Sequence, residues 1–203
     1  MGIRGNNNTS NDADLSAFTG STALSYDVCL EFRVQAQMKH LILISGFPGC
    51  GKTTFMQWLS RKKQYFTLDM ERGGIDRDGF RDLWNRFLNG SDRESFIEQL
   101  FARSPRVALD WNFPVSCLHL VRALQERGCE VWWFEGYRLA ARRHFIERGT
   151  EPVSNFDRHV SEICAEWQDI ELIVGGRIIK SIDDEGHIIP PETIFHSFSG
   201  SPV

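Results

Sequence analysis

Residues 46–53 constrain the fold of this chain more than any other segment. They read Gly-Phe-Pro-Gly-Cys-Gly-Lys-Thr and fit the pattern G-x-x-x-x-G-K-[S/T]. Glycines let such a loop curl with its backbone N–H groups pointing inward, which makes a nest for an anion at the start of a helix. The apolar run at residues 41–44 precedes the segment, and a helix is expected at 51–62. The pattern therefore predicts a phosphate-binding loop between a buried strand and a helix.

The side chains of this loop have distinct expected roles. Lys52 would reach the β and γ phosphates of a nucleotide, and the Thr53 hydroxyl would coordinate Mg²⁺. Cys50 is expected to contribute its backbone only. The alternative is a fortuitous glycine-rich turn with no ligand. The residues expected to bind the nucleotide are Gly46, Phe47, Pro48, Gly49, Cys50, Gly51, Lys52, Thr53 and Thr54.

Strand and helix patterns alternate along the chain from residue 40 onward. Strands are predicted at residues 41–44, 65–69, 106–110, 130–134 and 171–174. Helices are predicted at residues 51–62, 80–88, 96–101, 116–127 and 138–148. Ser154 and Asp157 have the spacing of a capping box before a further helix, and turn signals around residues 177–182 suggest a small hairpin. Strands separated by helices indicate βαβ units and a mostly parallel sheet.

Composition excludes several classes of protein. The 203 residues include 23 basic and 27 acidic side chains, for a net charge of -4, which does not suggest a general nucleic-acid coat. No stretch is long and apolar enough to predict a membrane-spanning helix. The five cysteines are scattered and form no CxxC pair, so we expect a reducing compartment and a cytoplasmic location.

The first part of the chain differs from the rest. It opens with the polar run at residues 5–11 and shows no clean hydrophobic period. Met38 then begins a segment that reads like a natural start, with an apolar strand directly after it. We expect residues 1–37 to be a loosely ordered extension and residues 38–203 to be the folded domain.

The loop, the strand pattern and their spacing together resemble the small P-loop kinases. The likeness is to the group around polynucleotide kinase, zeta toxin and related AAA-type P-loop kinases of unassigned substrate, and it covers residues 38–175 approximately. It implies an α/β P-loop NTPase fold of the nucleoside and nucleotide kinase type. Such a fold has a parallel sheet of about five strands with helices on both faces. The resemblance also implies the strand order 2-3-1-4-5.

Two acidic residues end predicted strands. Asp110 follows the apolar run of residues 107–109, which is the Walker B arrangement, where a carboxylate holds Mg²⁺ directly or through water. The alternative is an aspartate that caps the next helix, and Asn112 has an equally open role. In the kinases that the chain resembles, an Asp at the position of Asp69 orients and deprotonates the acceptor hydroxyl. The alternative is a turn residue, in which case Glu71 and Asp76 are the other candidates.

Residues 137–148 form a basic helix with four arginines. The stretch resembles the kinase lid, whose arginines close over the phosphates and neutralise charge in the transition state. Arg138 and Arg142 are four residues apart and share a helix face, so they are the candidates for catalytic residues. The alternative is an amphipathic helix with a solvated basic face.

These features predict a kinase that uses ATP and Mg²⁺ and transfers the γ-phosphoryl group to a hydroxyl. Lys52, Asp69, Arg138 and Arg142 are the expected catalytic residues, and Thr53 and Asp110 are the expected metal ligands. The acceptor would be a small molecule or a nucleic-acid 5′ end. The nearly neutral charge of the chain disfavours the nucleic acid. The alternative is a nucleotide-binding regulatory or assembly module with slow hydrolysis and no acceptor. The sequence does not predict an oligomeric state.

Overall fold

A computed structural model describes residues 39–199, apart from positions 72 and 150. The predicted extension, residues 1–37, lies outside the described residues, so its boundary stays a prediction. The elements of the first half are β1 (His40–Gly46), α2 (Lys52–Lys63), β2 (Phe66–Asp69), α3 (Gly74–Arg77), α4 (Arg81–Leu88), α5 (Arg93–Arg103) and β3 (Arg106–Asp110). Those of the second half are a 3-10 turn (Val115–Cys117), α6 (Leu118–Gln125), β4 (Cys129–Glu135), α7 (Arg138–Arg148), α8 (Val153–Ala165), α9 (Trp167–Val174), β5 (Ile178–Lys180) and α10 (Pro191–Ser199).

The sheet has five strands in the order β2-β3-β1-β4-β5, and every neighbouring pair is parallel. This is the order that the resemblance implies, and the predicted α/β P-loop NTPase fold is confirmed. Its central strand β1 is buried on both faces, as the continuous apolar run at residues 41–44 predicts. Because all five strands run the same way, their carboxyl ends share one edge of the sheet.

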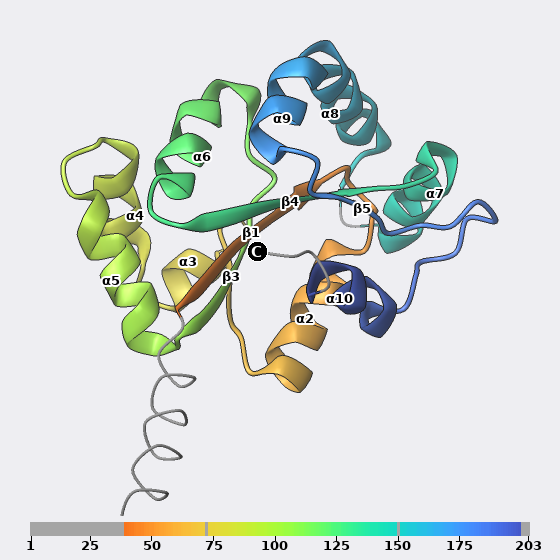
Figure 1. Ribbon diagram of the computed structural model, residues 1–203. Helices are drawn as coiled ribbons and strands as arrows, with labels where there is room; N and C mark the ends of the chain where they lie inside the picture. The colour runs from red at the N-terminus through yellow and green to blue at the C-terminus, as the bar shows by residue number, and fades with distance from the viewer. Residues whose placement is uncertain (1–38, 72, 150, 200–203) are drawn as a thin grey trace, which may run out of the picture. The chain divides into compact units, whose positions relative to one another are not determined.

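Helices cover both faces of the sheet (Figure 1). α2 and α10 lie on one face, and α6 and α9 lie on the other. Phe55 and Leu59 of α2 are buried against the sheet from the first face. Leu120, Val121 and Leu124 are buried from the second. No helix in the described ranges is long and apolar enough to cross a membrane.

One predicted strand and one predicted cap are wrong. Residues 171–174 belong to helix α9, where Ile170, Ile173 and Val174 are buried at helical spacing and Leu172 is 72% exposed. A short apolar run does not distinguish a strand from one face of a helix. The capping box at Ser154 is also wrong, because α8 begins at Val153 with Pro152 at its N-cap.

The end of the domain also differs from the prediction. β5 (Ile178–Lys180) joins the main sheet parallel to β4, which was not predicted. The predicted hairpin is limited to the residues after β5, where Ile189 N–H donates to the Ser181 carbonyl oxygen and Asp183 N–H to that of His187, both at 2.9 Å. Ile182 and Ile188 form only an isolated antiparallel bridge after it. Besides α9, two helices were not predicted, α3 (Gly74–Arg77) and α10 (Pro191–Ser199). Ile194 and Phe198 of α10 are buried in the core, so this helix covers part of the sheet near β5.

Candidate phosphate-transfer site

The loop between β1 and α2 folds in a way that only glycine permits at two positions. Gly46 has φ +140° and Gly49 has φ +78°. A Cβ at Gly46 would lie 2.1 Å from the carbonyl oxygen of Phe134, and one at Gly49 would lie 2.1 Å from that of Ala141. The loop is therefore packed directly against the backbones of β4 and α7, which fixes its curvature.

The first turn of α2 is open to a ligand. None of the described side chains caps this helix, and its first turn carries no acidic residue. Residues 48–54 line a cavity of about 310 Å³ at this point. The first N–H groups of a helix have no partner within the helix and carry a partial positive charge. The open end of α2 therefore fits an anion such as a phosphate group.

Lys52 lies at the centre of this loop. Its ammonium group donates hydrogen bonds to the carbonyl oxygens of Gly46 at 3.0 Å and Phe47 at 2.9 Å. Burial lowers the pKa of Lys52, and the Asp110 carboxylate opposes that shift. The loop thus holds a half-buried cation beside a carboxylate, at the open end of α2.

The carboxyl ends of two neighbouring strands supply the acidic side of the cavity. Asp69 ends β2 and Asp110 ends β3, and the two are direct neighbours in the register of the sheet. Both line the cavity together with Glu71. Asp69 Oδ1 accepts a hydrogen bond from the backbone N–H of Glu71 at 2.9 Å, which orients the Asp69 carboxylate.

Glu71 is an unusual member of this acidic group. Burial of its carboxyl group raises the pKa of Glu71 to about 6, a shift that Asp110 and Asp69 increase and that the Asn112 N–H and Lys52 reduce. Glu71 Oε1 accepts the backbone N–H of Asn112 at 2.8 Å, so it links the chain after β2 to the chain after β3. The sequence offered Glu71 only as an alternative to Asp69.

The predicted arginines of α7 lie outside the cavity. The guanidinium of Arg138 lies 5.2 Å from the centre of the Phe47 ring, and Arg142 makes two hydrogen bonds to Asp157 of α8 at 2.9 and 3.2 Å. The arginine that lines the cavity is Arg148, stacked on Phe145 at 5.1 Å. Its charge lowers the pKa of Lys52, so it acts on the same loop.

The remaining predicted residues divide into two groups. One group lines the cavity and consists of Pro48, Gly49, Gly51, Thr53 and Thr54. Gly46 and Phe47 do not line it, because Gly46 packs against the backbone of Phe134 and Phe47 is buried. Cys50 also lines it, but burial raises the pKa of its thiol to about 11. The thiol therefore stays protonated at neutral pH, in keeping with a backbone role.

Sequence reasoning missed five cavity residues beside Arg148, namely His144, Phe145, Glu151, His159 and Ile188. His144 lies one helical turn before Arg148, and its buried Nδ1 has no hydrogen-bond partner among the described residues. His159 of α8 and Ile188 also line the cavity. The spacing of His144 and Arg148 on one helix face was a usable signal, but the basic stretch gave no reason to prefer that face.

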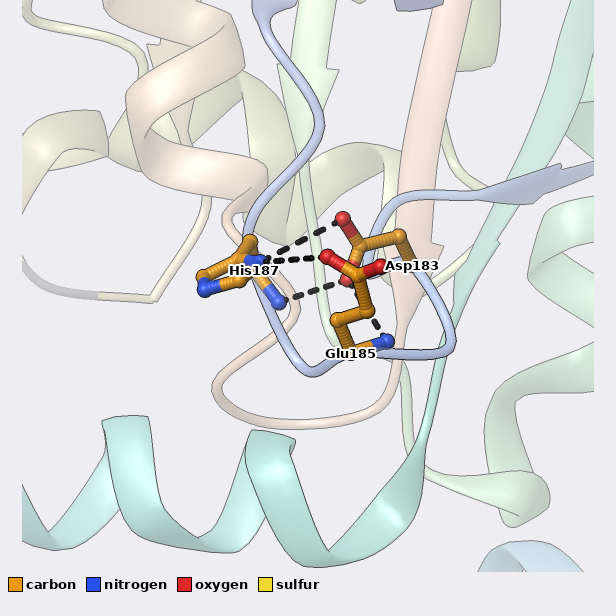
Figure 2. Close-up of side chains that lie close together, drawn as sticks. All are labelled: Asp183, Glu185 and His187. Atoms are coloured by element: carbon orange, nitrogen blue, oxygen red, sulfur yellow. Dashed lines mark hydrogen bonds and ion pairs between the residues drawn. The ribbon is translucent and has the colours of Figure 1, made fainter.

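A second group of polar side chains lies in the turn between β5 and α10, namely Asp183, Glu185 and His187 (Figure 2). Asp183 Oδ1 accepts the backbone N–H groups of Glu185 at 3.0 Å and His187 at 2.8 Å. These bonds close the turn on itself. The turn positions the neighbouring Ile188, whose side chain lies against Gly51 of the loop.

Comparison with known proteins shows similarity to this chain in fold alone. No family model and no curated protein matches the chain. Among solved structures, a shikimate kinase from Bacteroides thetaiotaomicron is 13% identical, with a TM-score of 0.48 over 79% of this chain and 96% of the other. A gluconokinase from Sinorhizobium meliloti is 13% identical, with a TM-score of 0.43 over 82% and 99%. A structure of the PezAT toxin-antitoxin system of Streptococcus pneumoniae is 13% identical, with a TM-score of 0.42 over 92% of each chain.

Proposed function

We propose that this protein is a kinase that transfers the γ-phosphoryl group of ATP to a hydroxyl group. The observation that carries the proposal is one cavity of about 310 Å³ that joins the open end of α2 and Lys52 to Asp69, Glu71 and Asp110. Such a cavity offers donors for a polyphosphate on one side and carboxylates for a metal and a hydroxyl on the other. Phosphoryl transfer needs mainly this positioning and charge stabilisation.

The donor would be held by residues 46–54. The phosphate oxygens would accept hydrogen bonds from the free N–H groups at the start of α2. Lys52 would exchange its two carbonyl partners for oxygens of the β and γ phosphates. Thr53 and Asp110 offer the oxygen ligands that Mg²⁺ prefers, and both line the cavity. When bound, Mg²⁺ would neutralise charge on the phosphates.

The transfer step would use Asp69 as the group that receives a proton. The acceptor oxygen forms a bond to the γ phosphorus while the bond from phosphorus to the bridging oxygen breaks, and ADP leaves. The acceptor O–H proton passes to the Asp69 carboxylate, which the Glu71 N–H holds in place. Arg148 would stabilise the charge on the moving phosphoryl group in place of Arg138 and Arg142.

A nucleotide-binding regulatory module is the second candidate. It would need the phosphate loop but no place for an acceptor. Asp69 and Glu71 lie in the same cavity as the loop, where a carboxylate can orient an acceptor hydroxyl in a kinase or a water molecule in a module that hydrolyses ATP. The two functions therefore differ in whether an acceptor is phosphorylated.

The variant Asp69→Asn separates the two functions. If Asp69 receives the proton, phosphoryl transfer should fall by roughly 100-fold or more, whereas ATP affinity should change little. Asp82→Asn, on the exposed face of α4, is the matched control and should transfer at the wild-type rate. Unchanged transfer by Asp69→Asn would remove Asp69 from the mechanism.

A further inference from the structure

A second cavity adjoins the phosphate cavity. It also measures about 310 Å³ and lies between the chain that follows β3, the strand β4 and the helix α8. Asn112 and His159 line both cavities, so the two meet at these side chains. A molecule in the second cavity would therefore reach the group of carboxylates through this junction.

The inner wall of the second cavity is aromatic. Phe113 and Trp133 meet edge to face, with their ring centres 6.1 Å apart, and both are buried. The Trp133 indole Nε1 is buried and has no hydrogen-bond partner in the part of the chain that the structure describes. A buried donor without a partner is costly, and such donors are rare in folded proteins. The Nε1 atom is closed off in this structure, so a polar atom of a bound molecule would satisfy it after side chains of the cavity wall shift.

The outer rim of the cavity comes from one face of α8. Arg158, His159 and Glu162 lie there, and their side chains form no hydrogen bond or ion pair with any other described residue. The rim therefore offers one cation, one carboxylate and one imidazole to a ligand. A polynucleotide would need a track of several cations for its phosphates, which this rim does not provide.

We propose that the second cavity binds the phosphoryl acceptor, and that the acceptor is an alcohol of nucleoside size with a flat ring. This inference rests on the proposed kinase function. The ring lies against Phe113 and Trp133, a polar ring atom accepts the Trp133 N–H, and the hydroxyl passes Asn112 and His159 toward Asp69. A pocket of this volume, mostly apolar with a few polar groups, is the usual form of a small-molecule site.

The test uses Trp133→Phe, which keeps an aromatic ring and removes the N–H group. Its matched control is Trp132→Phe, because Trp132 lies on the opposite face of β4, where its Nε1 donates to Glu130 at 3.2 Å. Transfer from γ-labelled ATP is measured with nucleosides, hexoses and a 5′-hydroxyl hexanucleotide. We expect label on a nucleoside. In Trp133→Phe, KM for that nucleoside should rise roughly tenfold while KM for ATP stays unchanged. In Trp132→Phe, both KM values should equal those of the wild type.

A second variant keeps the test valid if Trp133→Phe folds poorly. Arg158→Ala changes an exposed rim residue and should also raise KM for the nucleoside, whereas Arg122→Ala on the exposed face of α6 should not. Label only on a hexose or on the hexanucleotide would overturn the proposal. Equal KM values in wild type, Trp133→Phe and Arg158→Ala would overturn it as well, with the kinase function intact.

Failure of the kinase function has a different signature. In that case ATP binds but no acceptor is labelled, and nucleoside binding is then measured directly by titration calorimetry. Binding to wild type that weakens in Trp133→Phe but not in Trp132→Phe would support the second cavity as a nucleoside site without transfer. No binding of any nucleoside would overturn it.

Discussion

At the scale of single residues, the cavity depends on carboxylates held close to one another. Asp69 and Asp110 are neighbours in the sheet, and Glu71 is bonded to the backbone of Asn112 beside them. Loss of water on burial, and to a lesser degree the neighbouring negative charges, disfavours ionisation and raises the pKa of Glu71 to about 6. A bound Mg²⁺ would relieve this crowding, because a nearby cation favours the ionised carboxylates.

The pKa of Glu71 has a consequence for stability. A carboxyl group whose pKa rises from 4.5 to about 6 on folding binds its proton more tightly in the folded state. The free energy of unfolding of the nucleotide-free protein should therefore fall as pH rises from about 4.5 through about 6. Glu71→Gln keeps an acceptor for the Asn112 N–H and removes the charge. It should flatten this part of the pH profile and stabilise the protein at pH 7.5 by at most about 1 kcal/mol, since the side chain is partly exposed.

Urea unfolding between pH 4.5 and 8 measures this effect. Glu98→Gln, on the exposed face of α5, serves as the control and should keep the wild-type profile. If Glu71→Gln and wild type lose stability equally over the same pH interval, Glu71 is not the titrating group.

The site residues in the phosphate loop and at the ends of strands were predictable, whereas those on helices α7 and α8 were not. Asp69 and Asp110 follow apolar runs, and the end of a parallel strand has a known place at the edge of the sheet. Their presence in the cavity follows from that placement. Lys52 and the loop were predictable from spacing alone. Glu71 was less so, because its role depends on a bond to Asn112, 41 residues away.

At the scale of elements, helix α7 shows what the sequence pattern leaves open. The helix over residues 138–148 was predicted with its observed bounds, but the pattern does not tell which arginines face the loop. Contact with α8 decides this, because Asp157 holds Arg142 away from the cavity and leaves Arg148 inside it.

The two arginines should respond differently to mutation. Arg148→Ala should lower the rate of transfer by roughly 100-fold, because it removes a charge at the phosphates. Arg142→Ala should change the rate by less than about threefold and lower the melting temperature slightly, since it breaks an exposed ion pair between α7 and α8. Steady-state rates and thermal unfolding of both variants measure this. A larger loss of rate in Arg142→Ala than in Arg148→Ala would contradict the assignment.

The errors among the elements have a common cause. Residues 171–174 were predicted as a strand, yet they form the end of α9, and β5 is only the three residues Ile178–Lys180. Both segments are short and apolar, and local pattern does not separate a short strand from a buried helix turn. Tertiary contacts with β4 and α6 settle the outcome.

At the scale of the whole domain, the order of strands decides which residues meet in the cavity. β1 lies in the centre with β3 on one side and β4 on the other, so the loop after β1 meets Asp110 from β3 and the backbone of β4. The alternation of strands and helices predicts a parallel sheet but not its order. The order was available only from the resemblance to the P-loop kinases. The second cavity, which joins residues 112–115 to α8, was not predictable from local pattern.

The most direct test of the central claim is transfer of the γ-phosphoryl group from labelled ATP with Mg²⁺, measured over nucleosides, sugars and 5′-hydroxyl oligonucleotides. Lys52→Ala is the inactive control, because it removes the cation of the loop. The account predicts label on one class of acceptor, and loss of that label in Lys52→Ala. ATP binding with slow phosphate release and no labelled acceptor would contradict it and would favour the regulatory module.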